Sequence, residues 1–180
     1  FAATDAVIAA ELLRTMLRTA VEYSFNRVTV DGDTSTNDAC VLAATAASGV
    51  VVTSDDDVAV LQAALNDLAL ELAQGMIRDG EGASKFVSVV VEQGRDIEEC
   101  LEVAYTIAHS PLVKTALFAS DPNWGRIVMA IGRAGVDALD IDGVNVFLGD
   151  VSIVQAGGAA PSYTEAAGQA VMDQEDITIR

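Results

Sequence analysis

Residues 144–155 read VNVFLGDVSIVQ, and this stretch indicates the fold class. Two apolar runs flank the dipeptide Gly149-Asp150, whose residue types favour a tight turn between antiparallel strands. A second pair of apolar segments, 27–30 and 39–45, lies on either side of another such turn and predicts a second hairpin. Hairpins favour antiparallel pairing, so a chain that also contains several helices is predicted to be an α+β layered sandwich.

Apolar periodicity predicts the helices. The strongest pattern covers 56–77, where apolar residues recur every three or four positions, and Ser54 or one of the acidic residues after it can cap the helix. Further helices are predicted over 9–24, 96–108, 121–132 and 163–172. Further strands are predicted over 85–93, 112–119 and 176–180, the last resembling a strand cut off in progress. Without repeats or low-complexity segments, residues 1–180 are expected to form one domain.

Composition excludes several classes of protein. Among 180 residues, 27 acidic residues outnumber 10 basic ones, and the formal net charge is −17. Binding to nucleic acid requires a concentrated positive surface, so a nucleic-acid partner is not expected. A membrane span requires about 20 consecutive apolar residues, and no run in the sequence approaches that length, so membrane insertion is not expected either. Cys40 and Cys100 lack metal-type spacing and indicate a reducing compartment, the cytoplasm. His109 is the only histidine, which excludes a multi-histidine metal site, and no metal is expected.

Residues 31–38 read DGDTSTND, which is more polar than a turn requires. Asp31 and Asp33 match the Asp-x-Asp spacing of the haloacid dehalogenase phosphohydrolases, but no convincing acidic pair for magnesium follows. A calcium loop fails as well, because Thr36 stands where that loop needs glycine. The simpler interpretation is a network of short side chains, including Asn37, that satisfies its own backbone.

Residues 79–85 read DGEGASK and follow the longest predicted helix. Gly80 can end that helix in a left-handed conformation, and Gly82 allows close approach of a ligand. Glu81 lies between these glycines and is either a solvated acid or a ligand-binding carboxylate. The chain has only two lysines, Lys85 and Lys114, and both lie in motif-like segments.

Residues 110–126 combine SPLVKT with SDPNWGR. Asp121 and the proline after it are a typical helix start. Trp124 is predicted to be a packing residue in the first turn, and Arg126 to form a structural ion pair. His109 is most simply a cation at a helix C-terminus or a solvated side chain.

Five segments together resemble the ornithine acetyltransferases, also called glutamate N-acetyltransferases. Their order and separations match the family across essentially the whole chain. The segments are FAATDA (1–6), SFNRVTVDGDTSTNDAC (24–40), DGEGASK (79–85), SPLVKTALF (110–118) and SDPNWGRIVMA (120–130).

The resemblance implies a fold and a reaction. Members adopt an α/β/β/α sandwich with largely antiparallel sheets, shared with certain self-cleaving aminopeptidases. The precursor cuts itself before a threonine, which becomes the N-terminal nucleophile of the β chain. That threonine takes an acetyl group from N-acetylornithine and passes it to glutamate in arginine biosynthesis, without a cofactor. Whether acetyl-CoA also serves as donor varies in the family.

Residue by residue, the chain resembles a β chain of the family without its N-terminal nucleophile and without its C-terminal segment. The nucleophilic threonine lies a few residues before the segment that begins at Phe1, so Thr4 is not assigned as nucleophile and this polypeptide alone is expected to be inactive. Glu81 is the one substrate-binding residue that carries over. The resemblance further implies an α chain from the same precursor, which supplies the oxyanion hole, and αβ units that associate into a heterotetramer.

Two rival interpretations remain open at the level of sequence. One is the related aminopeptidase branch, which uses a serine nucleophile, and the other is a non-catalytic subunit. Within the transferase interpretation, Asp31, Asp33 and Asn37 are predicted to support the active site by holding the loop in one shape, without taking part in the chemistry.

Overall fold

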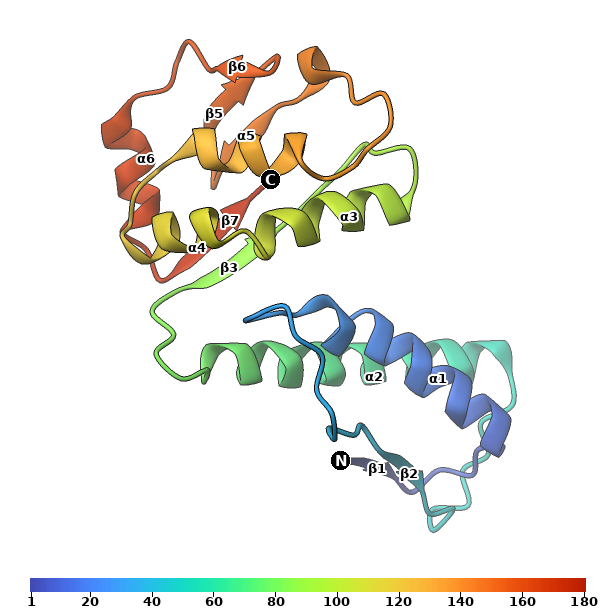
Figure 1. Cartoon of the computed structure of the whole chain (residues 1–180). Coiled ribbons are helices and arrows are strands. Elements are labelled where there is room, and N and C mark those ends of the chain that lie inside the picture. The colour runs from blue at the N-terminus through green and yellow to red at the C-terminus, as the bar shows by residue number, and fades with distance from the viewer. The chain divides into compact units, whose positions relative to one another are not determined.

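The computed structural model describes residues 1–180, which form two compact units, Phe1–Gly80 and Glu81–Arg180 (Figure 1). Each unit has its own helices and its own sheet. The single domain expected over 1–180 stays a prediction.

The first unit is a pair of helices joined to a small parallel sheet. Its elements in chain order are β1 (Ala2–Thr4), α1 (Ala10–Glu22), the 3₁₀ helix η1 (Phe25–Arg27), β2 (Leu42–Ala44) and α2 (Asp55–Arg78). The helices α1 and α2 pack against each other, and Gln62 of α2 donates a hydrogen bond to the carbonyl of Met16 over 3.1 Å. Met16 and Ala73 are almost fully buried.

The long helix α2 confirms the periodicity prediction to within one residue at each end. Ser54 is its N-cap, and the Ser54 hydroxyl accepts the backbone N–H of Asp57 over 3.2 Å. Three aspartates fill the first turn, where negative charge complements the helix dipole. Asp79 is the C-cap, and the left-handed backbone expected at Gly80 occurs instead at Gly82, with φ of +72°.

The second unit is a five-stranded mixed sheet covered by helices. Its sheet order is β3-β7-β4-β5-β6; β3 and β7 are parallel, and the other three pairings are antiparallel. Its elements are β3 (Phe86–Val89), α3 (Ile97–Ala108), α4 (Pro111–Phe118), α5 (Trp124–Gly132), the 3₁₀ helix η2 (Ile141–Gly143), β4 (Val146–Leu148), β5 (Val151–Gln155), β6 (Gly158–Ala159), α6 (Glu165–Met172) and β7 (Asp176–Ile179).

The hairpin at 144–155 forms as predicted. Strands β4 and β5 pair antiparallel around Gly149, whose φ of +56° is the left-handed conformation that glycine tolerates. Leu148, Ile153 and Val154 are almost fully buried and belong to the core of this unit. The α+β class is therefore confirmed.

The hairpin expected between 27–30 and 39–45 is wrong. Residues 28–41 have no regular secondary structure, and β2 pairs instead with β1, in parallel, with Ala2 opposite Leu42. The apolar run over 39–45 contains a strand, but the strand expected over 27–30 does not form, because Arg27 ends η1 and residues 28–30 are irregular. Strand pairing also depends on partners distant in sequence, which local patterns do not report.

The strand favoured over 112–119 is also wrong, because these residues form α4. The Ser110 hydroxyl accepts the N–H of Val113, and Pro111 occupies the first helical position; both features start helices. The next helix, α5, begins at Trp124 with Asn123 as N-cap, although Asp121 was expected to cap it.

Candidate functional site

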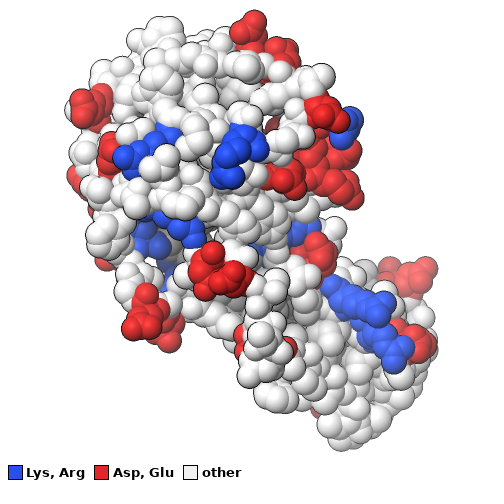
Figure 2. Space-filling view, in the orientation of Figure 1, with Lys and Arg blue, Asp and Glu red and all other residues white.

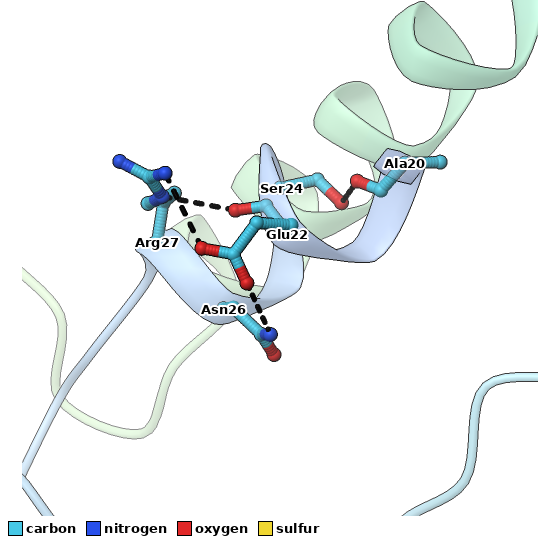
Figure 3. Close-up of polar contacts among 5 residues, drawn as sticks. All are labelled: Ala20, Glu22, Ser24, Asn26 and Arg27. Atoms are coloured by element: carbon cyan, nitrogen blue, oxygen red, sulfur yellow. Dashed lines mark hydrogen bonds and ion pairs between the residues drawn. The ribbon is translucent and has the colours of Figure 1, made fainter. Parts of the chain in front are cut away.

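The loop at 28–41 begins at a compact turn that closes α1 (Figure 3). The Ser24 side chain is fully buried, and its hydroxyl donates to the carbonyl of Ala20 over 2.5 Å. Glu22 accepts hydrogen bonds from two residues. Arg27 donates to the Glu22 carbonyl over 2.9 Å and to one carboxylate oxygen over 3.3 Å. Asn26 donates to the other carboxylate oxygen over 3.1 Å. These contacts fix the direction in which the chain leaves the helix.

Short side chains hold the loop's backbone, as the polar sequence predicted. The Asp31 carboxylate accepts the N–H of Asp33 over 2.8 Å. The Ser35 hydroxyl accepts the N–H groups of Asn37 and Asp38 over 3.2 and 3.0 Å. Asp33 and Asn37 use their backbones in these bonds, and their side chains are exposed. The acceptors that shape the loop are therefore Asp31 and Ser35.

The loop enters β2 beside the start of β1. The N–H of Ala2 donates to the carbonyl of Val41 over 2.9 Å, and Thr4 lies opposite Ala44 farther along the two strands. Because the strands are parallel, the residues just before β1 and the last residues of the loop lie at the same end of this sheet.

Glu81 is exposed and is the first residue of the second unit. Gly82 follows it in a left-handed conformation, with no atom within 4 Å of where a Cβ would stand. Lys85 then anchors the segment, because its ammonium donates to the carbonyls of Met172 and Gln174 over 2.6 and 3.2 Å. Such cations stabilise the orphan carbonyls at a helix C-terminus, here that of α6.

Asp31, Asp33 and Asn37 lie in one loop, and their support of the active site stays a prediction. Glu81 belongs to the other unit, and its position relative to that loop stays a prediction. No three His, Cys, Asp or Glu side chains converge in the structure in a way that could hold a metal ion.

The comparisons with known proteins identify the family. A model of the ArgJ family matches residues 1–180. The chain belongs to the ArgJ family. It is 52% identical to the arginine biosynthesis bifunctional protein ArgJ of Pseudomonas fluorescens strain Pf0-1, and 56% identical to that of Psychrobacter arcticus, covering 100% and 99% of this chain. The chain spans about half the length of these relatives, 45% of each.

A solved member of the ArgJ family confirms the fold. The crystal structure of ArgJ from Bacillus halodurans superposes with a TM-score of 0.91 at 34% sequence identity. The match covers 99% of this chain and 84% of the solved one. The sequence resemblance to the ornithine acetyltransferases is thereby confirmed at the level of family and fold.

The SDPNWGR segment is a structural joint between α4 and α5. Arg126 donates from one guanidinium nitrogen to the carbonyl of Leu112 and to the Thr115 hydroxyl, each over 2.9 Å. The structural role expected for Arg126 is correct, but its partners are neutral oxygens and not the carboxylate of an ion pair. Trp124 packs against the core as predicted, and Asn123 donates to the Asp121 carboxylate over 3.1 Å.

Helix α6 adds contacts to this joint that sequence reasoning missed. Gln169 donates to the carbonyl of Ser120 over 2.9 Å, and the Tyr163 hydroxyl donates to the carbonyl of Pro122 over 3.4 Å. Burial raises the pKa of Tyr163, with Glu165 and Asp121 adding to the effect. Local sequence patterns do not predict these hydrogen bonds, because each joins residues more than 40 positions apart.

The start of α3 carries the other perturbed groups. The Asp96 carboxylate accepts the backbone N–H of Glu99 over 2.8 Å. This hydrogen bond, together with the adjacent Arg95, lowers the pKa of the Asp96 carboxyl. Asp96 in turn raises the pKa of Arg95. This arrangement is an N-cap and explains the helix start without a catalytic role. His109 is the exposed C-cap of the same helix, with its ring 5.5 Å from that of Tyr105.

The surface is consistent with the acidic composition. In the view of Figure 2, Lys and Arg side chains lie in small groups among more numerous Asp and Glu side chains. None of the helices combines the length and the apolar character that crossing a membrane requires.

Proposed function

We propose that this chain is the β-chain portion of an enzyme that transfers an acetyl group from N-acetylornithine to glutamate in arginine biosynthesis. Membership of the ArgJ family and the name of its relatives, arginine biosynthesis bifunctional protein, support this assignment. The nucleophile is a threonine on the N-terminal side of Phe1, created when the precursor cleaves itself. Its α-amino group, or a nearby base, activates its hydroxyl.

The parallel pairing of Ala2 with the end of the polar loop is the observation that carries the proposal. A threonine just before β1 lies at the sheet end where the loop reaches Val41, since Ala2 donates to Val41 there. The loop hydrogen bonds of Asp31 and Ser35 hold the backbone beside the reacting group. Asp33 and Asn37 contribute through their backbones. The loop thus supports the site without taking part in the chemistry.

Two acyl transfers complete the reaction. The threonine hydroxyl oxygen attacks the acetyl carbonyl of N-acetylornithine, the C–N bond breaks, and the hydroxyl proton passes through the base to the departing amine of ornithine. The amine of glutamate then attacks the acetyl-threonine ester, the C–O bond breaks, and the threonine regains a proton as N-acetylglutamate leaves. An oxyanion hole supplied by the α chain stabilises both tetrahedral intermediates.

Glu81 binds the ammonium group of ornithine or of glutamate. A carboxylate beside Gly82 offers a charged acceptor on a backbone with open space around it. The α chain from the same precursor completes the unit, and αβ units associate into a heterotetramer in the cytoplasm. The reaction needs no cofactor, because the acetyl group arrives on ornithine; acetyl-CoA is the alternative donor to test.

The test uses the full-length protein. We expect it to yield two chains with threonine at the new N-terminus, and to convert N-acetylornithine and glutamate to ornithine and N-acetylglutamate. Replacing that threonine by alanine should abolish cleavage and transfer, and the isolated 180-residue chain should be inactive. Peptide hydrolysis without acetyl transfer would identify the aminopeptidase branch, and a folded protein with neither activity would identify a non-catalytic subunit.

A further inference from the structure

Three Asp-Gly pairs differ in how the structure holds the glycine amide. At such a pair the backbone nitrogen of the glycine can attack the side-chain carboxyl of the aspartate, because glycine has no Cβ to hinder the approach. The attack requires a glycine N–H that is free to react and a backbone that can bring the two groups together. The three pairs are Asp31-Gly32, Asp79-Gly80 and Asp142-Gly143.

Turns hold the glycine amide in two of the pairs. The N–H of Gly80 donates to the carbonyl of Ile77 over 3.2 Å, directly after the C-cap of α2. The N–H of Gly143 donates to the carbonyl of Asp140 over 3.1 Å, at the end of η2. In both pairs the attack must first break a hydrogen bond of regular structure, so both aspartates are protected.

The glycine amide of the remaining pair is free. The N–H of Gly32 has no hydrogen-bond partner. Gly32 has a φ of +89° and lies in the irregular segment 28–41, so neither a helix nor a strand ladder restrains rotation about the bonds beside Asp31. Both residues are exposed, so water can reach the product of the attack.

A neighbouring amide also favours the reaction at Asp31. The backbone N–H of Asp33 donates to Oδ1 of Asp31 over 2.8 Å. This bond closes an Asx turn, which folds the carboxyl back over the peptide bond to Gly32. When the carboxyl carbon becomes tetrahedral, its oxygen gains negative charge, and an N–H group already placed at that oxygen stabilises the charge as an oxyanion hole does.

We propose that Asp31 is a site of isoaspartate formation, through a cyclic imide with Gly32. The nitrogen of Gly32 bonds to Cγ of the protonated carboxyl of Asp31, and the amide proton and the carboxyl hydroxyl leave together as water. Water then opens the ring. Cleavage of the bond from nitrogen to the side-chain carbonyl restores aspartate, whereas cleavage of the bond to the main-chain carbonyl gives isoaspartate. The second product adds a methylene group to the backbone of the loop and removes the carboxylate that accepts the Asp33 amide.

Peptide mapping of the aged full-length protein tests the site. The protein is kept in mildly acidic buffer at physiological temperature for several weeks and then digested, and isoaspartate is detected by fragmentation and by methylation with an isoaspartyl methyltransferase. Isoaspartate at position 31 should exceed that at position 79 or 142 by roughly 5- to 10-fold, the factor that one hydrogen bond to the glycine amide supplies. Equal amounts at the three positions, or none at position 31, would overturn the proposal.

Two substitutions at Asp31 test the chemistry. Asp31→Glu keeps the charge but requires a larger ring, so it should abolish the modification there and leave Asp79 and Asp142 as in the wild type. Asp31→Asn keeps the acceptor of the Asx turn and releases ammonia, a reaction that needs no protonated carboxyl, so it should give isoaspartate faster than the wild type. An Asp31→Asn protein that forms no isoaspartate at this position would refute attack by Gly32.

The mapping does not depend on acetyl transfer, so the site and the proposed function can fail separately. If the loop supports the active site, acetyl-transfer activity of the aged protein should fall in proportion to the isoaspartate at position 31, and aged Asp31→Glu should keep the activity that it had when fresh. Constant activity while isoaspartate accumulates in the wild type would count against the supporting role of the loop and would leave the modification site established.

Discussion

The N–H of Ala2 donates to the carbonyl of Val41 over 2.9 Å, and this bond brings together two segments almost 40 residues apart in sequence. It places the polar loop beside the start of β1, in a parallel pair that no hairpin could form. The end of the loop therefore lies next to the residues that precede β1.

Replacing Ser35 with alanine should weaken the loop at one point. The amides of Asn37 and Asp38 would lose their acceptor and turn to water, at a cost of about 0.5–1 kcal/mol. If the loop supports the active site and this cost falls on the transition state, kcat for acetyl transfer by the complete enzyme should fall roughly 2- to 5-fold. Chemical denaturation and steady-state kinetics measure the two effects.

The control for Ser35 is Thr36→Ala, which removes a neighbouring exposed hydroxyl that makes no hydrogen bond. It should leave kcat and stability unchanged, as should alanine at the exposed side chains of Asp33 and Asn37. If the protein instead had an activity that strictly required magnesium, and Asp31→Asn abolished that activity, the result would favour phosphohydrolase chemistry. An unchanged kcat in Ser35→Ala would refute the supporting role of the loop.

Replacing Glu81 with glutamine should impair substrate binding in the complete enzyme while leaving the fold intact. Loss of a charged hydrogen bond to the substrate ammonium reduces kcat/KM by roughly 10- to 150-fold. Asp79→Asn is the matched control, since Asp79 is an acid in the same segment that caps α2 through its backbone. If the two variants have the same kinetics as the wild type, Glu81 is not part of the site.

Replacing Arg126 with methionine should destabilise the protein. The variant loses the bonds to Leu112 and Thr115 but keeps most of the aliphatic stem, and we expect the free energy of unfolding to fall by about 1–3 kcal/mol. Arg133→Met is the control, because Arg133 is exposed and makes one long bond of 3.5 Å to the carbonyl of Thr106. Equal losses in urea denaturation would show that the joint between α4 and α5 does not depend on Arg126.

Asp96 should make stability dependent on acid pH. The Glu99 amide and Arg95 hold the folded-state pKa of Asp96 below its usual value of 3.8, so its contribution is complete above pH 3.8 and is lost as the pH falls through the lower folded value. Asparagine at position 96 still caps the helix but does not titrate. Between pH 5 and pH 2.5, Asp96→Asn should therefore lose less stability than the wild type.

The control for Asp96 is Glu102→Gln on the same helix, where the carboxylate makes no hydrogen bond or ion pair. Its pH profile should follow the wild type. Identical profiles for all three proteins would mean that the Asp96 cap contributes nothing in this range.

Local sequence determined most helices and the 144–155 hairpin. The helix start at Ser54 and the turn at Gly149 each depend on groups within a few residues, so their residue types report them directly. The same holds for the polar loop, whose acceptors lie two or three residues from their donors. The segment at 112–119 was recognisable in principle, because Ser110 and Pro111 signal a helix start, but its apolar run outweighed those signals in the prediction.

Only the tertiary structure decided which strands pair and which side chains join distant segments. Ala2 donates a backbone hydrogen bond to Val41, β3 pairs with β7, and the side chain of Gln169 in α6 donates to the carbonyl of Ser120. In each case the partners are tens of residues apart in sequence. A strand's composition shows that it will pair, but the free energy that selects its partner comes from burial of both faces within the whole sheet. The family resemblance identified Glu81 and the polar loop as candidate site residues from the sequence alone. Only the tertiary structure placed the end of that loop beside the start of β1.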